Sequence, residues 1–119
     1  MSFPVPSPYA WDDSFDVGSD DFNNEHKKLF DLINALDADR GSADALNALL
    51  NYVLEHFAHE EKNMTAKGYE HFGPHKEIHD KFVADAKALT SVGDAEMTFI
   101  KQWLVDHIKG SDMKYKGKI

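Results

Sequence analysis

Four segments of the chain repeat apolar residues at the spacing of an α-helix, and turn residues separate them. In the first segment, Phe22, Leu29 and Ile33 fall on one helical face. The segments are bounded by Ser19 and Asp37, by Ser42 and Gly68, by Gly73–Pro74 and Leu89, and by Gly93–Asp94 and Gly110. Because the links are short, we expect an all-α fold, an antiparallel up-down-up-down four-helix bundle.

The first 18 or so residues follow a different pattern. Pro4, Pro6 and Pro8 disfavour a helix there, while aromatic residues such as Tyr9 and Trp11 indicate packing against the rest of the chain. We therefore expect an ordered N-terminal arm over residues 1–18. At 119 residues, the chain is predicted to form one domain over residues 1–119.

Composition excludes several classes of site and partner. The chain has no cysteine, so a transition metal must be held by imidazole and carboxylate rather than thiolate. A net charge of −8 argues against binding to nucleic acid. No apolar run approaches the roughly 20 residues of a membrane span. No secretory signal is visible at the N-terminus, so we expect a cytoplasmic, intracellular protein.

Polar residues with metal-binding side chains interrupt the apolar helical faces. They are His26, His56, Glu60, His75, His79, His107 and Asp112. Two pairs are spaced i, i+4, which places both side chains of each pair on one helix face. Helix rise puts the whole set within a slab of about 12 Å. Since a buried carboxylate needs a compensating cation, the pattern predicts a metal site inside the bundle.

Asp112 requires a break in the last helix, because a residue five positions after His107 does not share its face. Gly110 can end the helix there and let the chain return over the site. Five imidazoles, two bridging carboxylates and a solvent-derived bridge fall one bond short of filling two octahedral metals. This donor set suits iron, but it does not exclude manganese, copper or zinc.

The segments that carry these residues closely resemble hemerythrins, and especially the monomeric myohemerythrins. The resemblance rests on His56-Phe-Ala-His-Glu60, His75-Lys-Glu-Ile-His79, His107-Ile-Lys-Gly-Ser-Asp112, the Asn24–Phe30 run around His26 and the Pro8–Phe15 run of the arm. It covers essentially the whole chain.

The resemblance implies a cofactor of two iron ions in a non-haem di-iron centre with an oxo or hydroxo bridge. It assigns His75, His79 and His107 to one iron, His26 and His56 to the iron with the open position, and Glu60 and Asp112 to both. It also implies a dry oxygen pocket formed by Phe57, Trp103, Leu104 and Ile108. The implied function is reversible dioxygen binding for storage or transport, without enzymatic activity.

The same resemblance leads us to expect that small anions compete at the open iron. It favours a monomer, with a homo-oligomer as the alternative. Two other functions stay open from the residues alone: a di-iron oxidase or peroxidase, and iron or metal storage and detoxification. Oxygen-activating di-iron bundles use more carboxylate ligands than this set contains, which favours binding over activation.

Several neighbours of the candidate ligands have less certain roles. His59 and His71 are expected at the surface. Glu25 and Asp106 each adjoin a ligand histidine and are either its hydrogen-bond partner or plain surface charge. Tyr115 is a candidate to pack back on the body.

Overall fold

The computed structural model describes residues 3–89 and 91–119, and within them it contains helices and no strand. The four long helices are α1 (Asp20–Ala38), α2 (Ala43–Ala66), α3 (Phe72–Lys87) and α4 (Asp94–Gly110), with two short 3-10 helices, η1 (Asp13–Phe15) and η2 (Asp112–Tyr115). The all-α prediction is confirmed. Along the described ranges, none of the helices is both long enough and apolar enough to cross a membrane.

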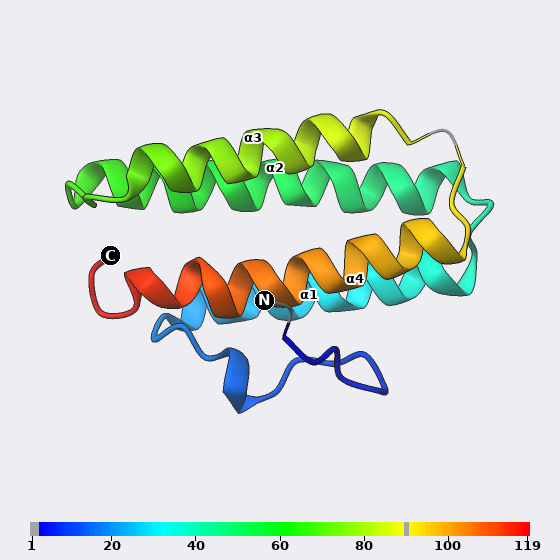
Figure 1. The fold of residues 1–119 in the computed structure, drawn as a ribbon, viewed down its shortest axis with the longest axis horizontal. Helices are drawn as coiled ribbons and strands as arrows, with labels where there is room; N and C mark the ends of the chain where they lie inside the picture. Colours follow the sequence, from blue (N-terminus) through cyan, green and yellow to red (C-terminus); the bar gives the residue numbers. More distant parts are fainter. Residues whose placement is uncertain (1–2, 90) are drawn as a thin grey trace.

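Consecutive long helices run in opposite directions, so the chain forms the expected up-down-up-down bundle (Figure 1). Helices α1 and α4 form one layer, and α2 and α3 form the other. α1 packs against both α2 and α4, and α2 packs against α3. As a result, the start of α1, the end of α2, the start of α3 and the end of α4 all lie at one end of the bundle.

Capping residues explain where the helices begin and end. The Ser19 hydroxyl accepts a hydrogen bond from the Phe22 N–H at 3.3 Å and starts α1. Ser42 does the same for α2 at 3.0 Å. After α2, Gly68 has a φ of 64°, a left-handed conformation that glycine adopts without steric cost and that turns the chain toward α3. α3 begins at Phe72, slightly before the predicted Gly73–Pro74 start.

The core consists of the apolar faces of all four helices. Its fully buried members include Leu29, Leu36 and Ile100. Each such side chain contributes roughly 1.5–3 kcal/mol relative to an exposed position. The apolar pattern of the third segment includes Ile78 and predicts an inward side chain, but Ile78 is 39% exposed, so this prediction is wrong. His79, one position along the helix, takes the inward direction instead, and neighbouring residues point about 100° apart.

The N-terminal arm is held against α1 and α4. Phe15 is fully buried, and the Tyr9 hydroxyl donates to the Lys101 carbonyl oxygen at 3.1 Å. The Phe3 N–H donates to the Asp106 carboxylate at 2.8 Å. Asp106 therefore holds the arm in place, a role that neither alternative from the sequence had assigned to it.

Candidate metal centre

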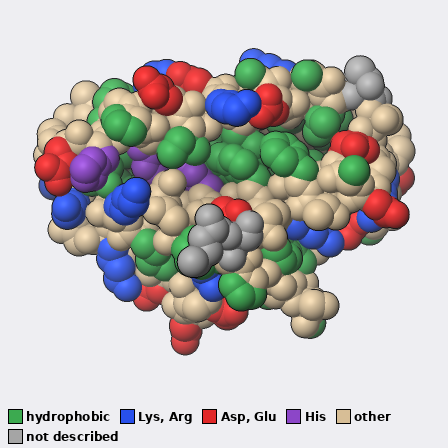
Figure 2. All heavy atoms as spheres, viewed as in Figure 1, with side chains coloured by type: hydrophobic (Ala, Val, Ile, Leu, Met, Phe, Trp, Pro, Cys, Tyr) green, Lys and Arg blue, Asp and Glu red, His purple; other side chains and the backbone are tan. Residues whose placement is uncertain are grey.

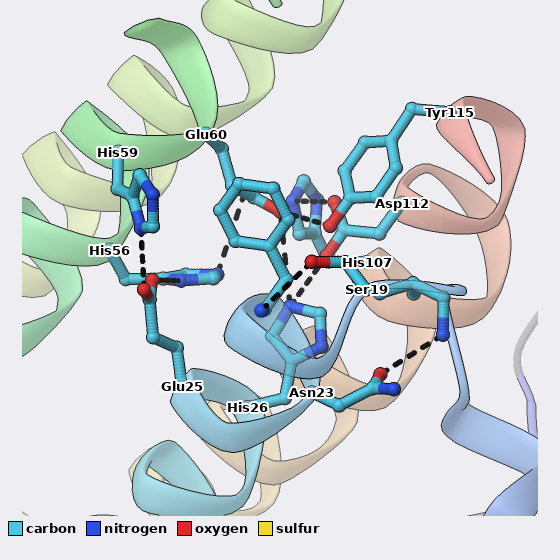
Figure 3. A network of polar contacts seen from close by, with 12 residues as sticks. Ser19, Asn23, Glu25, His26, His56, His59, Glu60, His107, Asp112 and Tyr115 are labelled. Carbon is cyan, nitrogen blue, oxygen red and sulfur yellow. Dashed lines mark hydrogen bonds and ion pairs between the residues drawn. The ribbon is translucent and has the colours of Figure 1, made fainter. Parts of the chain in front are cut away.

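The structure brings all seven predicted metal-binding residues together at one place inside the bundle. They come from four helices and the C-terminal turn: His26 from α1, His56 and Glu60 from α2, His75 and His79 from α3, His107 from α4 and Asp112 from η2. None of them is more than 4% exposed. The cluster lies near the end of the bundle where α2 passes into α3 (Figures 1 and 3).

The seven side chains form two overlapping groups. In each group, one ligand atom per residue lies within 4.8 Å of all the others. The first group contains Glu60, His75, His79, His107 and Asp112, and the second contains His26, His56, Glu60 and Asp112. Only the two carboxylates belong to both groups. This arrangement suits two metal ions that share Glu60 and Asp112 as bridging ligands.

Asp112 reaches the cluster because α4 ends at Gly110 and η2 turns the chain back. Its two oxygen atoms face different groups. Oδ2 lies 3.1 Å from His26 Nε2. Oδ1 lies 3.0 Å from His75 Nε2 and 3.1 Å from His107 Nε2. Each oxygen can therefore serve one of the two ions.

Glu60 is the second shared carboxylate. Its Oε1 lies 3.3 Å from His79 Nε2 and 3.5 Å from His56 Nε2, so this oxygen faces both groups. Its Oε2 accepts a hydrogen bond from the Tyr115 hydroxyl at 2.5 Å, deep in the protein. Tyr115 thus packs back on the body and fixes the orientation of a carboxylate (Figure 3).

Further carboxylates orient two of the histidines from outside the cluster. His56 Nδ1 donates to Glu25 at 2.6 Å, and His59 Nδ1 donates to the other oxygen of Glu25 at 2.5 Å (Figure 3). His79 Nδ1 donates to Glu61 at 3.0 Å. These bonds fix the tautomers of His56 and His79, so that the unprotonated Nε2 of each of these two histidines faces the cluster.

The chemistry inside the cluster calls for cations. With Nδ1 protonated, His56 Nε2 and His79 Nε2 present lone pairs toward the Glu60 carboxylate. Several buried atoms have no hydrogen-bond partner: His26 Nε2, His75 Nε2, Glu60 Oε1 and both oxygens of Asp112. Acceptors that face acceptors in a buried site repel one another unless a positive ion lies between them. The residues present therefore fit metal ions.

The electrostatic field within the site attracts positive charge. Burial alone would raise the pKa of Asp112, but the surrounding histidines, His107 foremost, hold it well below its ordinary value. Burial and Asp112 would raise the pKa of Glu60, but His56 and His79 outweigh them and lower it. Both shared carboxylates are thus ionised. Burial would lower the pKa of His56, but Glu60 and Glu25 raise it, because their field attracts positive charge.

A sequence-family model described as "Hemerythrin HHE cation binding domain" matches residues 17–119 of the chain. The chain belongs to the hemerythrin family. This finding confirms the resemblance drawn from the sequence.

Relatives and solved structures agree over nearly the full length. A "Hemerythrin-like protein" of Naegleria gruberi is 59% identical over 117 residues, covering 98% of each chain. The "Myohemerythrin" of Riftia pachyptila is 47% identical over 120 residues, covering 100% of each. A crystal structure of wild-type hemerythrin superposes with a TM-score of 0.86 at 31% identity, covering 92% of this chain and 95% of the other. The comparison with solved hemerythrins also confirms the four-helix bundle.

This hemerythrin-family chain has a small internal cavity beside the metal cluster. The cavity offers about 20 Å³ to the centre of a water-sized molecule, and its walls are almost entirely apolar. His56 and His107 form the side next to the cluster, and Phe57, Trp103 and Leu104 are among the other walls. Ile108, the fourth predicted pocket residue, is fully buried but lies outside the lining. The space suits one small molecule.

Sequence reasoning missed several contributors to the hemerythrin site. Phe82 lines the cavity, a role that the apolar pattern of its helix does not distinguish from that of an ordinary core residue. Glu61, which follows Glu60 and points away from the inward face of its helix, accepts a hydrogen bond from His79. His59 was expected at the surface. Its side chain is 38% exposed, but it also donates a hydrogen bond to Glu25. His71, with 54% of its side chain exposed, lies at the surface as expected.

Proposed function

We propose that this protein binds dioxygen reversibly at a non-haem di-iron centre, as an oxygen store or carrier. The observation that carries the proposal is that two features lie side by side, a double ligand group and a small apolar cavity. Two overlapping groups of imidazole and carboxylate ligands share Glu60 and Asp112. A small, largely apolar cavity for one small molecule adjoins the same ligands at His56 and His107. The names of the relatives, hemerythrin and myohemerythrin, support iron and dioxygen.

The proposed residue roles follow the two groups. His75, His79 and His107 would hold one iron, His26 and His56 the other, and Glu60 and Asp112 both. The second group has one histidine fewer, which leaves a coordination position free. When bound, a pair of ferrous ions supplies the two electrons that dioxygen accepts.

The protein's own contribution is to control water and protons. Phe57 and Leu104 are 4% and 5% exposed and line the cavity with carbon. An apolar cavity of this size stays dry. Excluding water keeps protons from the site, which favours release of dioxygen unchanged over its reduction. Glu25 and Glu61 hold His56 and His79 in orientation throughout.

We further propose that the protein is a carrier and not an enzyme. Five histidines and two carboxylates make the ligand set rich in nitrogen, whereas oxygen-activating di-iron bundles rely on more carboxylates. Small anions should compete with dioxygen for the free position.

The test is to load the protein with ferrous iron without air, count the iron, and record visible spectra over cycles of air and vacuum. A new absorption band that appears in air and vanishes under vacuum over several cycles supports the carrier. An irreversible change with release of peroxide or consumption of a co-substrate indicates an oxidase or peroxidase. More than two irons per chain without the band indicates storage. His79→Ala should lose paired iron, whereas the exposed His71→Ala should load normally.

A further inference from the structure

The internal cavity is separated from the surface by single side chains at two grooves. One groove runs along the seam between α3 and α4 and is lined by Ile78, Phe82, Phe99 and Trp103 among others. The other lies between α2 and α3 and includes Leu54, Phe57 and Val83. At these two places a small molecule could pass from a surface groove into the cavity.

The wall of the α3–α4 seam is a pair of aromatic rings. Phe82 and Trp103 line both the internal cavity and the outer groove. Their rings stack with centroids 3.9 Å apart and an interplanar angle of 20°. Outside them, Phe99 is 39% exposed. Figure 2 shows hydrophobic side chains gathered along this seam, with histidine side chains in view beside them. The outer groove also includes the charged residues Glu77, Lys81 and Asp85, but the wall between groove and cavity is apolar and one ring thick.

The wall on the α2–α3 side is held more firmly. Phe57 separates that groove from the cavity, and its ring lies face to face on His79 at 3.7 Å and 1°. His79 is in turn fixed by Glu61 and by the cluster. Moving Phe57 would disturb a metal ligand. α2 and α3 also pack closely, whereas the backbones of α3 and α4 hardly approach within 8 Å.

Phe82 is the ring of this wall that stacks on no proposed ligand. Trp103 stacks on His107 with centroids 4.5 Å apart and is held by that contact. Within the described residues, the rings that Phe82 meets are those of Phe57, Phe99 and Trp103, none of which is a proposed ligand. A rotation of the Phe82 ring thus opens the wall without moving the metal site.

We infer that dioxygen reaches the internal cavity through the seam between α3 and α4, past Phe82. The inference rests on the proposed function, which makes dioxygen the ligand. An apolar gas crosses an apolar seam without losing hydrogen bonds to water, whereas water and ions would lose theirs. The seam therefore favours the entry of dioxygen over that of water and ions, and it slows the water-assisted oxidation of the site by dioxygen.

The chain has no cysteine, so a single introduced cysteine can carry a bulky maleimide label at a chosen groove. A label on Phe99→Cys covers the α3–α4 seam. A label on Leu54→Cys covers the α2–α3 groove and is the matched control, since the two native side chains are 39% and 41% exposed. In the iron-loaded protein, the label at position 99 should slow dioxygen association and release together, at least tenfold, with Kd within twofold. The label at position 54 should change neither rate more than twofold. Equal iron content in both proteins checks that the site is intact.

A second measurement separates the route from the function. In the zinc-loaded protein, exchange of xenon between water and the cavity follows the same path without oxygen chemistry. Slower xenon exchange with the label at position 99 supports the route, even where the iron protein fails to bind dioxygen reversibly. The route is overturned if the label at position 54 slows xenon or dioxygen as much, or if the label at position 99 leaves both rates within twofold of the unlabelled variant.

Discussion

Replacing Glu25 by glutamine should weaken the hold on metal without touching a ligand. The Glu25 carboxylate accepts hydrogen bonds from His56 at 2.6 Å and from His59 at 2.5 Å. Burial would raise the pKa of Glu25, but these two bonds outweigh burial and lower it, so it is ionised at neutral pH. Glutamine keeps one acceptor oxygen and loses the charge. It can satisfy only one of the two histidines, and His56 loses the carboxylate that orients it.

The expected cost follows from contacts of this kind in other metal sites. Loss of a carboxylate that orients a ligand histidine reduces metal affinity about 10–100-fold. That range corresponds to roughly 1.4–2.7 kcal/mol. Because Glu25 keeps 20% of its side chain exposed, screening by water places the change near the lower end, at about tenfold. Glu61→Gln should cost less, because the amide oxygen can still accept from His79 at 3.0 Å.

The measurement is an equilibrium competition for iron against a chelator, with the rate of iron loss recorded in parallel. Glu55→Gln is the matched control, since Glu55 adjoins His56 on the same helix but is exposed. The control should retain iron like the unchanged protein. Equal iron affinity in Glu25→Gln and Glu55→Gln, both folded, would refute the view that the outer carboxylate tunes the site.

Three further substitutions test other parts of the structure. Tyr115→Phe loses a hydrogen bond to a buried carboxylate and should lower the free energy of unfolding in urea by about 1.5–3 kcal/mol. Tyr9→Phe loses a hydrogen bond to a neutral carbonyl and should lower it by roughly 0.5–1.5 kcal/mol. A larger loss of stability in the Tyr9 variant would contradict this ranking. Leu36→Ala, at a fully buried site away from the cluster, should cost about 2–5 kcal/mol while two metal ions still bind. The hydrogen bond from Lys101 lowers the pKa of Asp37 in the folded protein. The ionised Asp37 therefore stabilises the fold fully above the ordinary aspartate pKa, and this stabilisation is lost as the pH falls through the lowered pKa. The stability difference from Asp37→Asn should therefore shrink on acidification, and a difference that grows would reverse the sign.

The clustering of these residues could be predicted because helix geometry makes their spacing informative. His56 and Glu60 share a face by the i, i+4 rule, and both lie in the cluster. Asp112 was harder, since it needs the helix to end first, but Gly110 marks the position where the helix ends. In both cases a local rule is sufficient to fix which direction the side chain faces.

The supporting residues could not be predicted in the same way, because their roles depend on how separate helices pack. Glu61 lies about 100° around α2 from Glu60, and only the position of α3 brings it to His79. Tyr115 lies beyond the last long helix, where no periodicity applies. The inward position predicted for Ile78 was wrong for a related reason. The apolar face of α3 is wide enough in sequence to include it, but the packing of α3 directs His75 and His79 inward.

The ligands come from every long helix and from the C-terminal turn, and this distribution has a consequence for the lifetime of the fold. Bound metal acts as a reversible cross-link among distant parts of the chain, and its binding free energy becomes folding free energy. The free concentration of metal ion then sets the stability, and a chelator acts as a denaturant. Asp112 lies in η2, the last of the described helices. Opening η2 is therefore the smallest rearrangement that removes a bridging ligand, and the exchange of metal with solvent should report how often that turn opens.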